Sequence, residues 1–340
     1  MKTSTSKRLR WNVAIWLAAG LFMTGAAGMA AGPIMPDPKA EARHQPQVEE
    51  TANGIPLVNI TAPSSGGVSR NEYETFNVPD KGAILNNSYT LSKTELAGYV
   101  QGNNNMAERP AKIIVNEVTG AGPTSMDGFL EVAGNRADVV IANPNGITVN
   151  GGGFINTGKA FLTTGKPVYD GEDHLQRFDI TGGDILIEGK GLGGKETESL
   201  AILSRAVKIN AGIWAKDLHI TTGTNTVDAK TLEASAIEGK GGCPAFALDT
   251  AAIGGMYAGR ITLVGTEKGL GVNNSGTWSA EDNLTLDWNG DLKNSGTIYS
   301  KGNTDLRASR LENDKTIAAE RNLSAAAKEN IRNQGKLLAG

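Results

Sequence analysis

The sequence has 340 residues, including 44 glycines and one cysteine, and carries a formal net charge of −3 at pH 7. Lys and Arg form no run after the first ten residues, which excludes the basic footprint of a nucleic-acid-binding protein. The single thiol, Cys243, cannot form an internal disulfide, so the fold does not depend on disulfide bonds. Only 5% of the residues are aromatic while 39% are hydrophobic, a composition that favours a β-solenoid over a sandwich or an α/β enzyme.

The first 31 residues have the layout of a secretory signal peptide. Four basic residues precede the apolar run 11–22, and a stretch of small residues follows at 25–32. Because the apolar run is short for a membrane-spanning helix, a signal peptide at residues 1–31 is favoured over an uncleaved anchor. We therefore expect export, with the mature chain released or held at the cell surface.

The next segment, residues 32–50, differs in composition from the rest of the chain. It combines charges of both signs with four prolines, namely Pro33, Pro36, Pro38 and Pro46. Few of its residues are suited to burial, so the segment is predicted to be a flexible leader without a core of its own.

Short strands are predicted from residue 55 onward. Short apolar runs are bounded by Gly, Asn, Asp or Pro, and extended helical periodicity is hard to find. The clearest runs are Ile55–Ile60, Ala111–Val115, Val139–Ala142, Ile185–Ile187, Ile202–Ile209 and Ile261–Val264.

The C-terminal part repeats with a period near 20 residues. An Asn-Ser-Gly-Thr word recurs with variation at steps of 20, 19 and 20 residues, which is typical of a solenoid whose coils bury their apolar faces against one another. Asparagine tolerates tight turns and can form hydrogen-bonded ladders between layers. We therefore predict a stacked ladder, rather than independent turn residues, formed by Asn274, Asn294, Asn313 and Asn333.

Several longer words follow one another along the chain. They are Asn53–Ile60, Asn71–Val78, Ala137–Ile147, Gly153–Thr157 and, much later, Ala252–Ile261. In this order they resemble the secretion domain of two-partner secretion (TPS) exoproteins, which include filamentous haemagglutinins, contact-dependent inhibition toxins and secreted haemolysins. The resemblance implies an all-β fold: a right-handed parallel β-helix with coils of roughly 20 residues and hairpins outside the helix.

The resemblance also implies how the mature chain is divided. Residues 51–270 correspond to the TPS secretion domain, and residues 271–340 to haemagglutinin-type repeats. We expect these repeats to continue beyond residue 340, because a solenoid without a terminal cap exposes an apolar layer.

Two turns are implied to matter for secretion. One consists of Asn143, Pro144, Asn145, Gly146 and Ile147, and the other of Asn103, Asn104, Asn105 and Met106. The family often has Asn-Pro-Asn-Leu at the latter, and losing the proline removes a fixed φ from that turn. Many relatives also have a cysteine pair where this chain has Val149 and Gly152. The sequence leaves open whether a transporter contacts these turns or whether they are simply good β-turns.

The implied function is mechanical. The domain would cross the periplasm unfolded, be recognised by an outer-membrane β-barrel transporter with periplasmic binding domains, and fold at the surface of a Gram-negative bacterium or outside it. Strand addition is a plausible contact mode for the extended chain, and coils that add to a formed end could draw it outward without ATP. A receptor on a host cell or a neighbouring bacterium is left unnamed.

Two alternatives stay open. Parallel β-helices also include polysaccharide-active enzymes, and Asp127, Glu131 and Asp138 lie near one another in the sequence. However, His44, His174 and His219 are far apart and lack metal-ligand spacing. We therefore expect no catalysis, cofactor, metal or nucleic-acid partner for these residues. The other alternative is a free-standing adhesin that binds host glycans or proteins.

Overall fold

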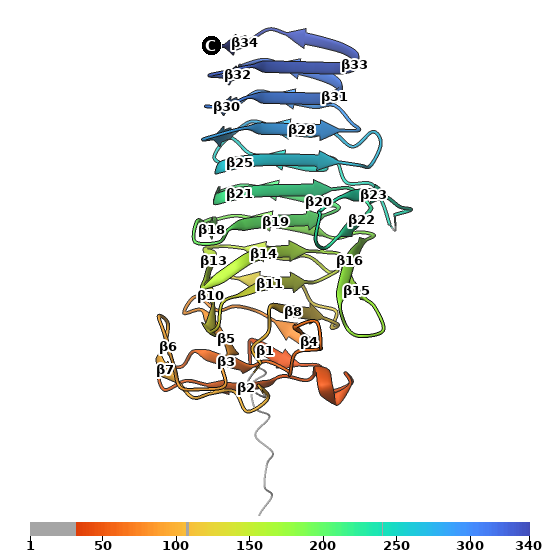
Figure 1. The fold of residues 1–340 in the computed structure, drawn as a ribbon. Coiled ribbons are helices and arrows are strands. Elements are labelled where there is room, and N and C mark those ends of the chain that lie inside the picture. Colours follow the sequence, from red (N-terminus) through yellow and green to blue (C-terminus); the bar gives the residue numbers. More distant parts are fainter. Residues whose placement is uncertain (1–31, 107–108, 240) are drawn as a thin grey trace, which may run out of the picture. The chain divides into compact units, whose positions relative to one another are not determined.

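The structure is a computed structural model that describes residues 32–106, 109–239 and 241–340. The predicted signal peptide, residues 1–31, lies outside this part of the chain. Residues 33–340 form a stack of coils whose short strands build three parallel ladders along the stack (Figure 1). No α-helix occurs in the described residues, where the helical structure is limited to the 3-10 turn η1 (Ala42–His44).

The three ladders share their strands among successive coils. The first ladder contains β3 (Pro56–Asn59), β5 (Ala83–Asn87), β10 (Phe129–Gly134), β13 (Gly152–Ile155), β18 (Leu192–Gly194), the first parts of β21 (Gly212–Thr222) and β25 (Gly255–Gly265), β27 (Thr277–Ala280), β30 (Thr297–Ser300), β32 (Thr316–Ala319) and β34 (Lys336–Ala339). The second contains β4 (Val68–Phe76), β8 (Ile113–Val118), β11 (Ala137–Ala142), β14 (Thr157–Thr163), β19 (Ser199–Ser204), the later parts of β21 and β25, β28 (Leu284–Trp288), and the first parts of β31 (Thr304–Asn313) and β33 (Leu323–Asn333). The third contains β9 (Thr124–Met126), β12 (Ile147–Val149), β17 (Asp184–Ile187), β20 (Ala206–Ile209), β24 (Leu248–Thr250), β26 (Val272–Asn274), β29 (Leu292–Asn294) and the later parts of β31 and β33.

The inside of the stack is one continuous apolar core. Alternate residues of each strand point inward, so Leu284 and Leu286 are buried on β28 while Thr285 between them is exposed. Trp288 fits inside because Gly265 on the neighbouring strand has no side chain: a Cβ there would come within 2.3 Å of the indole ring. The predicted parallel β-helix with coils of about 20 residues is confirmed.

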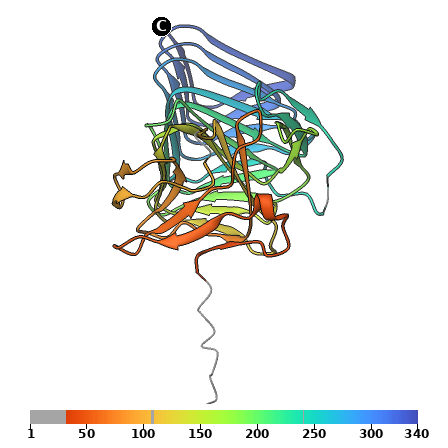
Figure 2. The same ribbon diagram turned by 60° about the horizontal axis from the view of Figure 1, so that its bottom comes forward.

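The N-terminal segment caps the stack, so the prediction of a flexible leader at residues 32–50 was wrong. Strand β1 (Ile34–Pro36) runs antiparallel to β4, and β2 (Gln47–Glu50) runs antiparallel to β3. Ile34 joins the core and His44 is buried. Figure 2 brings this end of the stack forward, with the cap in red and orange. The composition of this segment suggested flexibility, but prolines and charges are also typical of edge strands.

Hairpins leave the helix at two corners, as predicted. Strands β6 (Ser92–Thr94) and β7 (Gly98–Val100) form one hairpin. A four-stranded antiparallel sheet consists of β15 (Lys166–Tyr169), β16 (Leu175–Ile180), β22 (Asn225–Asp228) and β23 (Ala234–Ala236). Phe178 and Val227 of this sheet form a second apolar cluster with residues of the second ladder. The second ladder is therefore buried on both faces there, which explains the unbroken apolar run Val139–Ala142.

Candidate functional site

Residues 143–146 form a tight turn between β11 of the second ladder and β12 of the third. The Gly146 N–H donates to the Asn143 carbonyl oxygen at 3.1 Å, and the Asn145 N–H donates to the Asn143 side-chain oxygen at 2.9 Å. These two bonds are those of a β-turn closed by an asparagine side chain. Gly146 has a φ of +108°, where residues with a Cβ are strained.

The Asn143 side chain ties this turn to the preceding coil. Its Nδ2 donates to the Gly122 carbonyl oxygen and to the Thr124 hydroxyl, each at 3.0 Å. Asn145 adds a bond from its own Nδ2 to the Gly120 carbonyl oxygen at 2.8 Å. Asn143 is fully buried, so these bonds replace water for groups that would otherwise be unpaired.

Residues 103–106 form a turn with the same hydrogen-bond pattern. The Met106 N–H donates to the Asn103 carbonyl oxygen at 3.1 Å, and the Asn105 N–H donates to the Asn103 side-chain oxygen at 2.9 Å. Asn103 Nδ2 donates to the Ile60 and Asn86 carbonyl oxygens, both at 2.9 Å. Asn103 and Asn143 therefore play the same structural role: each side chain closes its own turn and also binds polar groups outside it. The turn at residues 103–106 does so without a proline.

The two turns do not form one common site. Residues 103–106 precede β8 and connect the first ladder to the second, whereas residues 143–146 connect the second ladder to the third. Met106 and Ile147 enter the core, and only Asn104, Pro144 and Asn145 are exposed. In the folded domain these three residues are what a partner could touch.

The four stacked asparagines lie in register at one corner of the helix. Asn274 Nδ2 donates to Asn294 Oδ1 at 2.8 Å, Asn294 to Asn313 at 2.7 Å, and Asn313 to Asn333 at 2.7 Å. The first three are fully buried. The two inner side chains, Asn294 and Asn313, thus each donate to one coil and accept from another, and the three bonds link four coils through side chains alone.

A buried charge cluster at the N-terminal cap was missed by the sequence analysis. Arg70 pairs with Glu72 at 2.9 Å and with Glu117 at 3.2 Å, and its guanidinium lies over the Tyr169 ring. His44 lies 3.1 Å from Glu72. Burial raises the pKa of the Glu117 carboxyl. The cluster joins the cap, β4, β8 and the hairpin β15–β16, and no sequence signal links segments so far apart.

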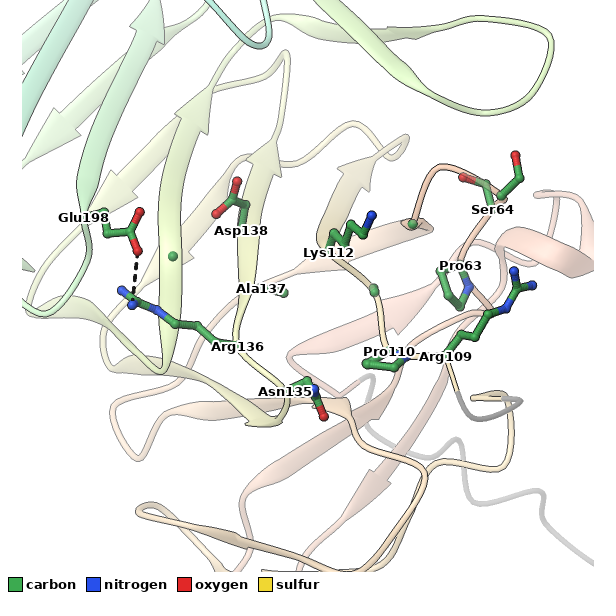
Figure 3. A pocket seen from close by; sticks show the side chains of 14 residues that line it. Pro63, Ser64, Arg109, Pro110, Lys112, Asn135, Arg136, Ala137, Asp138 and Glu198 are labelled. Atoms are coloured by element: carbon green, nitrogen blue, oxygen red, sulfur yellow. Dashed lines mark ion pairs between the residues drawn. The ribbon is translucent and has the colours of Figure 1, made fainter.

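A groove of about 600 Å³ lies along the turns that lead into the second ladder (Figure 3). Charges of both signs line it, and Arg136 forms an ion pair with Glu198 at 3.2 Å. The Asp138 carboxylate accepts the Lys159 N–H at 2.7 Å. The two carboxylates that line the groove are already engaged, since Glu198 is held in this ion pair and Asp138 binds a backbone amide.

The acidic residues considered for the enzyme alternative have separate structural tasks. Glu131 accepts the backbone N–H groups of Glu95 at 2.7 Å and Leu96 at 2.9 Å. Burial raises the pKa of both Glu131 and Asp138, but the two carboxylates bind different loops. Asp127 follows β9 and takes part in neither of these contacts. The three acids therefore do not converge on one reacting centre.

Two of the three histidines lie near one hairpin turn, because His44 Nε2 is 3.8 Å from the carboxylate of Asp173, the residue before His174. His44 belongs to the cap cluster, and His174 contacts Asp170 at 2.9 Å in the turn of a hairpin. Burial lowers the pKa of His219 to about 4. Within the described ranges, no three His, Cys, Asp or Glu residues are grouped so that they could hold a metal ion. No helix in the described part of the chain is both long and apolar enough to cross a membrane.

Comparison with known proteins decides the family. A family model described as the TPS secretion domain matches residues 33–299. The chain belongs to the TPS secretion domain family. The match to this TPS domain begins at the cap and extends into the repeats, and is thus wider at both ends than the expected 51–270.

The relatives of this TPS domain are much longer proteins. Toxin CdiA of Yersinia pestis is 42% identical over 294 residues, which cover 80% of this chain and 9% of the relative. The 16S rRNA endonuclease CdiA of Enterobacter cloacae is 44% identical over 260 residues, covering 76% of this chain and 8% of the relative. This TPS domain therefore spans less than a tenth of the curated relatives that it matches.

A solved structure supports the fold. The crystal structure of the filamentous hemagglutinin secretion domain superposes with a TM-score of 0.70 and 30% sequence identity, over 91% of this chain and all of that one. The family and the fold thus agree on a secretion domain, and neither favours a polysaccharide-active enzyme or a free-standing adhesin.

Proposed function

We propose that this TPS domain is recognised by an outer-membrane β-barrel transporter with periplasmic binding domains, and that it folds only after it has crossed that barrel. The observation that carries the proposal is the family match over residues 33–299. The stack is well suited to this role because each coil pairs with its neighbours along the chain. Coils can therefore fold one after another as they emerge, starting from the capped end.

We propose that the turns at residues 103–106 and 143–146 act in this folding step, and not as epitopes that the transporter reads. The argument rests on burial. Asn103 and Asn143 have almost no exposed surface, and their side chains donate hydrogen bonds to neighbouring coils. Each turn fixes a corner between two ladders, so an incorrectly formed turn would shift the register of the coil that follows.

The test is secretion of residues 1–340 with and without a co-expressed cognate transporter. We expect folded, protease-resistant chain in the medium only when the transporter is present. Asn143→Ala and Asn103→Ala should each lower the yield of resistant chain. Asn135→Ala is the matched control, because this asparagine is exposed on a turn between β10 and β11. Release without the transporter would contradict the proposal.

Binding of the unfolded chain separates folding from recognition. The urea-unfolded chain, diluted onto the periplasmic domains of the transporter, should bind equally well with or without Asn143→Ala. A variant that no longer binds in this assay would show that the transporter reads the motif directly, and would overturn the folding role.

We further propose that the longer protein is a surface exoprotein of the CdiA type. This rests on relatives at 42–44% identity that are named toxins or nucleases. The toxin activity would lie beyond residue 340. A competition assay between cells with the full-length gene and sensitive neighbours should show contact-dependent killing, and killing that persists after deletion of everything beyond residue 340 would contradict this assignment.

A further inference from the structure

The outer face of the first ladder carries two large aromatic rings on adjacent coils. Trp214 on β21 is directly opposite Tyr257 on β25 in the ladder register, and these two strands are neighbours in the stack (Figure 1). Their ring centroids are 6.2 Å apart and the ring planes differ by only 17°. Tyr257 is 39% exposed. The inward-facing neighbours, Ile213 and Met256, are part of the core.

Glycines allow the two aromatic rings to pack closely against the outer face of the first ladder. A Cβ at Gly212 would lie 2.5, 2.6 and 3.1 Å from three carbons of the Trp214 ring, and a Cβ at Gly191 would lie 3.0 Å from it. The distances from Gly212 place the indole ring over that glycine, and Trp214 is half-buried. Gly255 similarly makes room for the Tyr257 ring, since a Cβ there would meet it at 2.7 Å.

Polar groups surround this platform. A recess of about 450 Å³ is lined by both rings together with Lys195, Lys216, Ser279 and Glu281. Glu281 is already paired with Lys301. Neither Lys195 nor Lys216 has an ion-pair partner among the described residues, so the two free charges at the rim are positive.

We propose that this platform binds an acidic polysaccharide, with sugar rings stacked on Trp214 and Tyr257 and carboxylates held by Lys195 and Lys216. The C–H groups on one face of a pyranose ring carry partial positive charge, which complements the negative π-face of an aromatic ring. The two rings are on adjacent strands, so a chain lying along the stack meets them in succession. A nucleic acid would need a longer track of cations along its phosphates.

The chain provides its own spectroscopic probe. Beyond residue 31 it contains only three tryptophans, and Trp278 and Trp288 are fully buried. A ligand that stacks on the platform should therefore change the emission of Trp214. Titration of the secreted chain with oligogalacturonate is expected to give a saturable change, whereas no saturable change with a correctly folded chain would overturn the proposal.

Variants distinguish stacking from simple charge attraction. Tyr257→Ala should weaken oligogalacturonate binding about tenfold, in line with the loss of one aromatic contact. Lys195→Gln combined with Lys216→Gln should weaken it similarly but leave neutral cellohexaose unaffected. Tyr99→Ala is the matched control, since Tyr99 is 70% exposed on the hairpin β6–β7, and should bind as the wild type does. Far-ultraviolet circular dichroism and thermal melting check that each variant is folded.

Two competitors identify the class of ligand. Polyglutamate has the carboxylates without sugar rings, and oligo(dT) has phosphates and bases. Either one binding as tightly as oligogalacturonate would overturn the assignment to a polysaccharide. The proposal goes beyond the secretion function, because chain refolded without a transporter should bind equally well.

Discussion

Asn294 and Asn313 are 19 residues apart in sequence, yet the Nδ2 of one donates to the Oδ1 of the other at 2.7 Å with both side chains fully buried. The side-chain oxygen of Asn294 also accepts a hydrogen bond from Asn274. Removing an inner member of this ladder therefore leaves a donor on one side and an acceptor on the other without their partner. A buried polar group without a partner costs more than the bond itself contributed.

We expect Asn294→Ala to lower the free energy of unfolding by about 2–3 kcal/mol, measured by urea titration of the secreted chain. Asn322→Ala is the control, because Asn322 Nδ2 also donates to an asparagine of the preceding coil, Asn303, but at an exposed position. Water can replace that bond, so the expected loss is below about 0.5 kcal/mol. Equal losses for the two variants would show that burial of the ladder is unimportant.

A proline at position 104 should stabilise the first turn. The turn has the same hydrogen-bond pattern as residues 143–146, where proline occupies the equivalent position, and both Asn104 and Pro144 are exposed. Asn104→Pro should raise the free energy of unfolding by about 0.4–1 kcal/mol, because it restricts the unfolded chain. Pro144→Ala should produce the opposite change. A destabilising Asn104→Pro would show that the two turns differ in backbone angles despite their shared bonds.

These turns also show what the sequence can and cannot predict. The repeat spacing locates Asn274, Asn294, Asn313 and Asn333 in one phase, and a periodic stack then has only one register in which they can meet. The turn words likewise predict a local bond pattern, because an asparagine closes its own turn within two or three residues. Periodicity therefore predicted a solenoid and the asparagine ladder, whereas the parallel β-helix and the two turns at residues 103–106 and 143–147 were implied by the family resemblance.

Contacts that join distant, non-repeating segments could not be predicted in this way. Arg70 and Glu117 meet only because two coils stack, and Tyr169 reaches them from a hairpin that interrupts the repeat. The cap was missed for the same reason: its strands pair antiparallel with the first coil, and no period relates them to it. The platform of Trp214 and Tyr257 depends on residues 43 positions apart in a region where a long loop hides the repeat.

Acid should destabilise the domain through His219. Burial lowers the pKa of this histidine from 6.5 to about 4, so the unfolded chain binds a proton more readily than the folded one between these values. The contribution of the neutral His219 to stability is therefore complete above pH 6.5. It is lost as the pH drops towards 4, which lowers the free energy of unfolding by up to about 3 kcal/mol. His219→Gln should remove this part of the pH dependence. The difference between wild type and variant, measured by urea unfolding from pH 7 to pH 4, isolates it from the carboxylates, and a difference that does not change with pH would contradict the burial of a neutral imidazole.

The cap should be needed for a soluble, folded stack. Ile34 packs in the core beneath β4, and the antiparallel strands β1 and β2 cover edges of the first coil that would otherwise be open to pairing with other chains. Deletion of residues 33–50 should therefore cause aggregation, seen as loss of the monomer peak in size-exclusion chromatography. Ile34→Asp tests the same contact without shortening the chain, and should cost several kcal/mol because it buries an unpaired charge (about 3 kcal/mol or more). Lys39→Asp, at an exposed position of the same segment, changes the charge without touching the core and should remain monomeric. A monomeric, fully stable deletion variant would mean that the first coil closes its own end, and that the cap acts only in export.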